Sequence, residues 1–221
     1  MKPRLLDLFC GAGGASMGYS RAGFEVVGVD IKPQPHYPFE FHQADALTYP
    51  LDGFDAFHTS PPCQFITVAG TNHRKAGKTY PNLIPATRQR LIETGKPYVI
   101  ENVPGAPLRN PFILCGTMFG LRLKRHRLFE SNFPMWWPPA TCSCYRPGFD
   151  CRPNGVHKAY AFAFGAKLIS VSGHNFHLAD AQEAMGIDWM GQKEISQAIP
   201  PAYTEYIGKY LLKAVMELSN G

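Results

Sequence analysis

An apolar run that ends in a glycine-rich turn is the feature that most constrains the fold of this chain. Residues 4–9 read as a buried strand, residues 10–14 carry three glycines, and residues 15–22 suit the start of a helix. Further strand-like runs alternate with helix-compatible stretches, and they cover residues 25–29, 54–59 and 97–103. This alternation predicts an α/β fold in which a mostly parallel sheet carries helices on both faces.

The second half of the chain changes character after a strand-like run at 126–130. Residues 133–160 are rich in proline, tryptophan and cysteine, which is typical of an irregular segment. Helical spacing of apolar side chains returns at 178–185 and at 201–218. A chain of 221 residues fits one domain with a small insert. We therefore expect three parts, namely a core (1–130), a short irregular insert (131–173) and C-terminal helices that complete the core (174–221).

The charge of the chain and its cysteine content indicate which kind of partner it binds and in which cellular compartment it occurs. The formal charge is +5, and basic residues concentrate at 73–78, 88–90 and 122–127, which suits a polyanionic partner. No run approaches the roughly 20 apolar residues of a membrane span. The first residues lead directly into a core strand, so we expect a cytoplasmic protein without a signal peptide. In a reducing compartment, the six cysteines favour chemistry or metal binding over disulfides.

One cysteine lies on a turn stiffened by two prolines. Cys63 follows Pro61 and Pro62 directly after the strand-like run at 54–59. Proline restricts the backbone, so this turn would hold the thiol in one place. A nucleophilic thiolate needs such a fixed position, whereas a buried structural cysteine beside a turn is the alternative interpretation. Asp30 ends the second strand-like run, where an acid can bind ribose hydroxyls.

Seven blocks of sequence occur in an order typical of one enzyme family. They are Asp-Leu-Phe-Cys-Gly-Ala-Gly-Gly (7–14), Gly-Val-Asp (28–30), Asp-Ala-Leu (45–47), Ser-Pro-Pro-Cys-Gln (60–64), Glu-Asn-Val (101–103), Arg-His-Arg (125–127) and the closing block 198–208. On these blocks the chain resembles the S-adenosylmethionine-dependent DNA (cytosine-5)-methyltransferases over nearly its whole length. The resemblance implies a class I methyltransferase (Rossmann-like) fold, S-adenosylmethionine as cofactor and methylation of cytosine C5.

The resemblance assigns catalytic roles to four residues. The Cys63 thiolate would add to C6 of cytosine and so activate C5 toward an electrophilic methyl group. Glu101 would act near N3 if burial raises its pKa, although a strand-end acid paired with an arginine is the structural alternative. Arg127 would lie near O2 and the Glu101 carboxylate, and Arg125 would face the thiolate or a phosphate. Leu123 departs from the family, which usually has glutamine there.

The resemblance also implies a set of cofactor contacts. Phe9 would lie against the adenine, and Ile31 would pack on it. The three glycines Gly11, Gly13 and Gly14 would leave room for the methionine part. Asp30 would hold the ribose and Asp45 the adenine amine. Gln197 stands where the family has asparagine, so its assignment depends on a longer side chain reaching the same place.

Duplex DNA is the partner that the resemblance implies, and base flipping is then required. A base inside a duplex cannot reach Cys63, so the nucleotide must leave the stack. Residues 65–78 resemble the family's mobile catalytic loop, and their basic side chains could meet phosphates. Only residues 129–173 are available to read sequence, so we expect a target of roughly two to four base pairs. The compact chain suggests a monomeric phage or restriction-modification enzyme.

The insert contains a candidate zinc site. Its pattern is Cys142-x-Cys144-x6-Cys151-x5-His157, with His174 or His177 as substitutes for the histidine. Three thiols and an imidazole can hold a structural zinc, which would organise a segment too small for its own core. The spacing matches no standard zinc finger, and three incidental cysteines are the alternative.

Two other functions are compatible with the same motifs. An RNA cytosine-5 methyltransferase would share the catalytic residues and differ in its response to the 2′-hydroxyl. A catalytically silent DNA-binding protein would retain the cofactor fold alone, although the joint presence of Cys63, Glu101 and Arg127 disfavours it.

Overall fold

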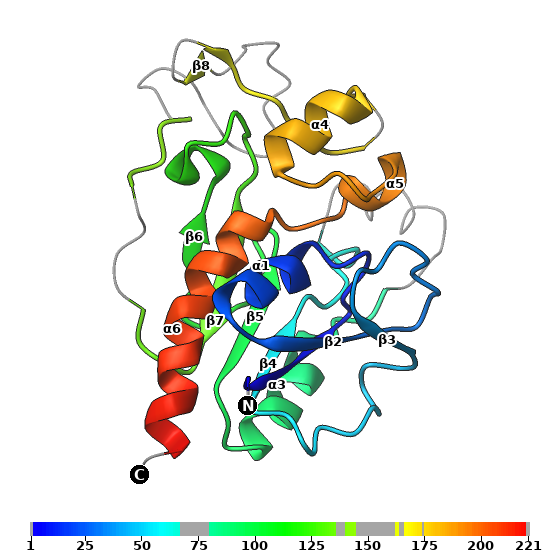
Figure 1. The fold of residues 1–221 in the computed structure, drawn as a ribbon, viewed down its shortest axis with the longest axis vertical. Helices are drawn as coiled ribbons and strands as arrows, with labels where there is room; N and C mark the ends of the chain where they lie inside the picture. The colour runs from blue at the N-terminus through cyan, green and yellow to red at the C-terminus, as the bar shows by residue number, and fades with distance from the viewer. Residues whose placement is uncertain are drawn as a thin grey trace.

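The computed structural model describes residues 2–66, 80–135, 140–144, 162–163, 166–173 and 175–219 (Figure 1). A seven-stranded sheet forms its centre. The strands are β1 (Arg4–Leu8), β2 (Glu25–Asp30), β3 (Glu40–Gln43), β4 (Ala56–Thr59), β5 (Tyr98–Asn102), β6 (Phe112–Leu114) and β7 (Arg127–Ser131). The helices are α1 (Gly14–Ala22), α3 (Ile84–Glu93), the 3₁₀ helix η1 (Gly116–Phe119), α4 (Leu178–Met185), α5 (Gln192–Ile195) and α6 (Pro201–Ser219). A separate small hairpin pairs β8 (Phe162–Ala163) with β9 (Ala166–Lys167).

The sheet is mostly parallel. Its strand order is β3-β2-β1-β4-β5-β7-β6, and β7 runs antiparallel to both of its neighbours. The chain leaves β1 toward β2 on one side and returns to β4 on the other side. In an open α/β sheet, ligands bind in the crevice outside the carboxyl ends of the strands at such a switch point. The topology therefore places a binding crevice beyond the ends of β1 and β4.

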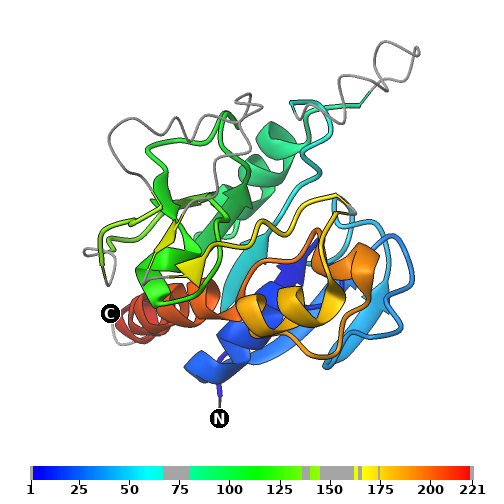
Figure 2. The same cartoon turned by 90° about the horizontal axis from the view of Figure 1, so that it is seen from above.

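Alternate residues of the central strands enter two different cores. Leu5 and Val26 pack in the cluster that contains Tyr19 of α1 and Tyr203 of α6. The next residues along the same strands pack on the opposite side, in the cluster that contains Leu91 of α3. Figure 2 shows α1 and α6 on one side of the sheet and α3 on the other. The predicted helices on both faces are thus confirmed, as expected where parallel strands are buried on both sides.

Glycines allow α1 and α6 to approach each other closely. A Cβ on Gly18 would collide with Thr204 Oγ1, and a Cβ on Gly208 would lie 2.5 Å from the Ala22 Cβ. Thr204 Oγ1 also donates a hydrogen bond of 2.8 Å to the Ala15 carbonyl. The C-terminal helix is therefore part of the same core as the first helix.

The predicted elements agree closely with the observed ones. The strand-like runs at 4–9, 25–29, 54–59 and 97–103 correspond to β1, β2, β4 and β5, and the helices predicted at 15–22, 178–185 and 201–218 correspond to α1, α4 and α6. Short strands β3 and β6 were not expected, because each has only three or four residues and no clear alternation. The division at 130 and 173 stays a prediction. Within the described ranges, no helix is long and apolar enough to span a membrane.

Candidate active site

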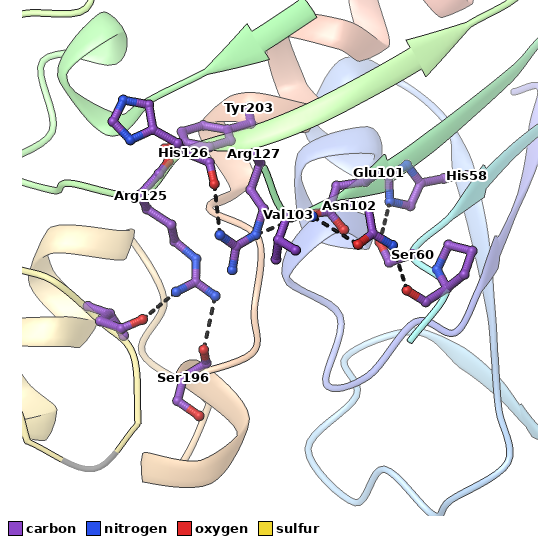
Figure 3. A network of polar contacts seen from close by, with 12 residues as sticks. His58, Ser60, Glu101, Asn102, Val103, Arg125, His126, Arg127, Ser196 and Tyr203 are labelled. Atoms are coloured by element: carbon purple, nitrogen blue, oxygen red, sulfur yellow. Dashed lines mark hydrogen bonds and ion pairs between the residues drawn. The ribbon is translucent and has the colours of Figure 1, made fainter. Parts of the chain in front are cut away.

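The Ser60–Gln64 turn and the end of β5 meet at the carboxyl edge of the sheet. β4 and β5 are parallel neighbours, so the turn that follows β4 lies beside the last residues of β5. Asn102 Nδ2 donates a hydrogen bond of 2.8 Å to the Pro61 carbonyl, and Asn102 Oδ1 accepts one of 3.0 Å from the Val103 amide. The Asn102 side chain thereby ties the proline turn, and with it Cys63, to β5 (Figure 3).

Glu101 and Arg127 form an ion pair next to this turn. Arg127 Nε lies 3.0 Å from Glu101 Oε1, because β7 pairs antiparallel with β5 and brings the start of β7 to the end of β5. Glu101 is only 6% exposed. Burial raises the pKa of the Glu101 carboxyl, while the Arg127 charge, a hydrogen bond from Ser60 and the Arg125 charge oppose that rise. A buried acid with a raised pKa keeps its proton at a pH closer to neutral.

Arg125 is held from a different direction. Its Nη2 donates a hydrogen bond of 3.0 Å to the Ser196 carbonyl, and its Nη1 donates to the Val171 carbonyl. The Tyr203 hydroxyl donates one of 2.6 Å to the Arg125 carbonyl. Figure 3 shows the guanidinium groups of Arg125 and Arg127 on the same side of the chain, with the His126 ring on the other. Side chains therefore alternate along this segment, with the two arginines on one side.

Cys63 is partly buried among these charges. Burial raises the pKa of the Cys63 thiol, and the Glu101 carboxylate raises it further, whereas the Arg127 and Arg125 charges lower it. Protonation of Glu101 would remove the second cause of the rise. The thiol therefore becomes easier to ionise when Glu101 is neutral, and this couples the acid to the nucleophile.

The glycine turn after β1 faces the same edge of the sheet. The Gly11 amide donates a hydrogen bond of 3.1 Å to Asp30 Oδ2, and the Lys32 amide donates one of 3.0 Å to Asp30 Oδ1. Gly11 has a φ of 51°, and a Cβ there would meet nothing within 4 Å. Ile31 beside Asp30 is 65% exposed. An oriented carboxylate, an open backbone and an exposed apolar side chain together fit a nucleoside-containing ligand.

Packing within the chain explains two of the predicted cofactor glycines without a ligand. A Cβ on Gly13 would lie 2.8 Å from Pro38, and one on Gly14 would lie 2.5 Å from the Ile199 carbonyl. Phe9, at a φ of 58°, packs against the core on the α3 side. The cofactor contacts of these residues stay predictions.

The remaining predicted cofactor residues lie on the same half of the molecule. Asp45 is exposed after β3, and its Oδ1 accepts a hydrogen bond of 2.9 Å from the Leu47 amide. Gln197 is exposed directly after Ser196, whose carbonyl accepts from Arg125. Their cofactor contacts also stay predictions.

Comparison with known proteins finds a family match in the first half of the chain. Residues 3–110 match the C-5 cytosine-specific DNA methylases, a range that contains the glycine turn, Cys63 and Glu101. These residues belong to the C-5 cytosine-specific DNA methylase family. A curated relative, the type II methyltransferase M1.HphI of Haemophilus parahaemolyticus, is 33% identical over 44% of this chain. The match spans about a third, 32%, of that relative's length.

Solved structures of similar fold cover nearly the whole chain. A DNA modification methyltransferase encoded within an E. coli prophage is 15% identical, with a TM-score of 0.62, and the match covers 99% of this chain and 100% of that one. The Entamoeba histolytica methyltransferase EhMeth is 12% identical, with a TM-score of 0.60 and coverage of 96% and 98%. S. pombe Dnmt2 methyltransferase is 15% identical, with a TM-score of 0.56 and coverage of 100% of both chains. The fold is therefore that of the class I methyltransferases.

The family's usual glutamine before the first arginine is replaced by a buried leucine here. Leu123 is fully buried in an apolar cluster with Val171 and Met185. Its neighbours Arg122 and Lys124 exchange backbone hydrogen bonds of 2.9 and 2.8 Å with Ile169. Leu123 thus packs the arginine segment against the C-terminal part of the chain instead of offering a hydrogen bond.

Two predicted features fall partly outside the described residues. Of the expected catalytic loop at 65–78, residues 67–78 lie outside them, as do Cys151, His157 and His174. His177 immediately precedes α4. Cys142 and Cys144 lie within the described part of the chain, together with Cys115 and His126, which were not among the predicted ligands.

Sequence reasoning also missed a set of buried polar contacts beneath α1. Asp7 on β1 lies in register with His58 on β4. Ser16 Oγ donates a hydrogen bond of 2.5 Å to Asp7 Oδ2, and the Tyr19 hydroxyl lies 2.9 Å from His58 Nδ1. Burial raises the pKa of Asp7 to about 7 and lowers the pKa of His58 to about 3. The only sign of these contacts in the sequence is that Asp7 and His58 are polar residues within otherwise apolar strands.

These two groups are expected to change stability with pH in opposite directions. As pH falls from about 6.5 to 4, the unfolded state takes up the His58 proton and stability falls, whereas folded Asp7 takes up a proton and stability rises. Each group changes the free energy of unfolding by about 1.4 kcal/mol per pH unit, so the two opposite contributions nearly cancel. When the pH is lowered from 6.5 to 4.5, the free energy of unfolding of His58→Gln should rise by roughly 2–3 kcal/mol relative to that of the wild type. That of Asp7→Asn should fall by a similar amount relative to the wild type.

Urea unfolding at the two pH values measures both differences. Loss of hydrogen bonds lowers the stability of each variant at either pH, so only the change with pH is compared. If the free energy of unfolding changes by the same amount between the two pH values in the wild type and in both variants, neither group has the shifted pKa.

Proposed function

We propose that this protein transfers the methyl group of S-adenosylmethionine to C5 of cytosine in duplex DNA. The observation that carries the proposal is the meeting of Cys63 with the Glu101–Arg127 ion pair, spaced 3.0 Å, at the sheet edge that also holds the glycine turn. A thiol, an acid with a raised pKa and two guanidinium groups are the set that attack on a pyrimidine ring requires. The family of residues 3–110 supports this chemistry.

The side chains divide the reaction into three steps, namely addition to C6, methyl transfer to C5 and elimination. The Cys63 thiolate bonds to C6, and the ring electrons move toward C5 and N3. Protonated Glu101 supplies a proton to N3. C5 then bonds to the methyl carbon while the carbon–sulfur bond of the sulfonium donor breaks, leaving a neutral thioether. Loss of the C5 proton to solvent expels the Cys63 sulfur from C6, and the N3 proton returns to Glu101. The Arg127 cation stabilises charge near O2 throughout.

The donor would lie beside the glycine turn. S-Adenosylmethionine supplies an electrophilic methyl group when bound. Asp30, already oriented by the Gly11 and Lys32 amides, would accept hydrogen bonds from the ribose, and exposed Ile31 would cover the adenine. Phe9, Asp45 and Gln197 would complete the contacts around the base and the amino acid part.

Two relatives support a biological setting for the protein. We infer an enzyme of a restriction-modification system or a phage, because one relative is a type II methyltransferase and one structural relative is encoded within a prophage. We also propose that it is monomeric and cytoplasmic, as expected from the sequence. A flipped cytosine must reach Cys63, and the short segment between β7 and α4 suits a target of roughly two to four base pairs.

A methylation assay with paired substrates tests the proposal. An unmethylated plasmid and a transcript of the same sequence are incubated with the protein and S-adenosylmethionine, and 5-methylcytosine is mapped at base resolution. We expect methylation of the plasmid alone, at cytosines that share their flanking bases. Methylation of the transcript alone would overturn the duplex DNA assignment, and none on either substrate by protein that binds the donor would overturn the activity.

A further inference from the structure

Four potential metal ligands converge behind the arginine segment. The ligand atoms of Cys115, His126, Cys142 and Cys144 all lie within 4.8 Å of one another. Cys115 Sγ is 3.7 Å from Cys144 Sγ, and His126 Nε2 is 3.5 Å from Cys142 Sγ and 3.3 Å from Cys144 Sγ. Around a tetrahedral zinc, sulfur ligands lie about 3.8 Å apart and sulfur and nitrogen about 3.6 Å apart. These three distances are therefore close to those of a closed tetrahedral site.

The sheet itself brings two of these ligands together. β6 and β7 are antiparallel, and Leu114 pairs with Arg127. Continuing that register by one residue places Cys115 opposite His126. Cys142 and Cys144 come from the separate segment 140–144, and their sulfurs lie 3.0 Å apart. One ion would thus join three segments that are distant in the sequence.

Neighbouring groups support ligands at these positions. Thr117 Oγ1 lies 3.6 Å from the sulfurs of both Cys115 and Cys142, and it accepts a hydrogen bond of 3.1 Å from the Ser143 amide. Cys115 is fully buried and Cys144 is 3% exposed. Hydroxyl donors around thiolates are typical of the shell that orients metal ligands. The cluster thus contains both the ligands and a group that supports them.

We propose that Cys115, His126, Cys142 and Cys144 bind one structural zinc ion. Three sulfurs and one imidazole nitrogen in a closed tetrahedron select zinc among the common divalent metals. Four ligands fill its coordination, so Cys151 and His157 are not required. The proposal keeps Cys142 and Cys144 from the sequence-based ligand set and puts Cys115 and His126 in place of Cys151 and His157, which lie outside the described residues.

The ion would act as an anchor for the catalytic arginines. His126 lies between Arg125 and Arg127, and its carbonyl accepts a hydrogen bond of 2.8 Å from Arg127 Nη1. Fixing the His126 ring on one side of the segment holds the two guanidinium groups on the other. This consequence depends on the proposed function, whereas zinc binding itself does not.

Metal analysis of the purified full chain tests the site. We expect one zinc per chain in the wild type, loss of that zinc in Cys142→Ser and retention in Cys151→Ser and in Cys63→Ala. Cobalt added to metal-free protein should give the thiolate charge-transfer bands of a tetrahedral site. A mercurial thiol reagent added to the folded wild type should release one zinc to a colorimetric dye, which provides a measurement if Cys142→Ser does not fold.

Three results would overturn the assignment. The first is wild-type protein that carries no zinc and gives no tetrahedral cobalt spectrum. The second is loss of zinc from Cys151→Ser, which would restore the ligand set predicted from the sequence. The third is a mass spectrum that shows Cys142 or Cys144 in a disulfide in protein kept under reducing conditions. Inactive protein that retains its zinc would speak against the proposed function alone.

Discussion

Cys63→Ala is expected to lose methyl transfer by a factor on the order of 10⁴ or more, because the proposed reaction begins with addition of the Cys63 sulfur to C6. The Ser60–Gln64 turn is held by the Asn102 amide and not by the thiol, so the fold should persist. Turnover is measured as methyl groups incorporated into duplex DNA at saturating donor. Donor and DNA binding, measured by calorimetry, should stay within several-fold of wild type.

A trapped adduct separates the covalent role from a structural one. An oligonucleotide with 5-fluorocytosine at the target cannot lose fluorine as a cation, so the Cys63 sulfur would remain bonded to C6 after methyl transfer. We expect this adduct with the wild type and none with Cys63→Ala. Cys10→Ala is the matched control, since burial raises the pKa of the Cys10 thiol and keeps it unreactive. Full turnover by Cys63→Ala would exclude the covalent mechanism.

The second large effect concerns a buried ion pair at the other side of the sheet. Arg88 on α3 makes two hydrogen bonds of 2.7 Å to the Glu130 carboxylate on β7, and both side chains are nearly fully buried. The Arg109 amide donates a third bond of 2.7 Å to the same carboxylate. Arg88 was grouped among residues that suit a polyanionic partner; that interpretation is wrong for Arg88, because its guanidinium is buried and occupied by Glu130.

Glu130→Ala is expected to lower the free energy of unfolding by about 3–5 kcal/mol, because it leaves the Arg88 charge buried without a partner. Urea unfolding at neutral pH measures this value. The double variant Arg88→Met with Glu130→Leu should recover most of the loss, since it removes both charges and fills the space.

A surface ion pair provides the control. Glu217→Ala removes a partner of Lys213 in a pair whose side chains are more than half exposed, and the expected change is within about 0.5 kcal/mol. A loss from Glu130→Ala as small as that from Glu217→Ala would show that burial does not strengthen the Arg88–Glu130 pair.

Local sequence was sufficient for most elements of the fold. The apolar runs of β1, β2, β4 and β5 are buried on both faces, so each is continuous and easily recognised. Helix α6 has apolar side chains at helical spacing on the face that meets α1. β3 and β6 escaped prediction because their existence depends on pairing with a neighbour more than on their own side chains.

In the candidate site, too, local motifs predicted some residues, and other features depend on tertiary contacts. Cys63 and Glu101 were predicted from motifs, since each follows or ends a strand and the carboxyl ends of parallel strands share one edge. The partners of Arg125, namely the carbonyls of Val171 and Ser196, carry no sequence signal because any residue supplies a carbonyl. The pKa directions of Asp7 and His58 likewise depend on burial, which no motif states.

The sequence by itself determined the parallel βα architecture, the resemblance to one enzyme family and the motifs that carry the thiol, the acid and the two arginines. These properties depend on local periodicity and on motifs within a few residues. Only the tertiary structure decided which residues face Cys142 and Cys144. Cys115 and His126 reach them because β6 and β7 pair antiparallel in one register, and a shift of one residue would turn their side chains to the opposite face.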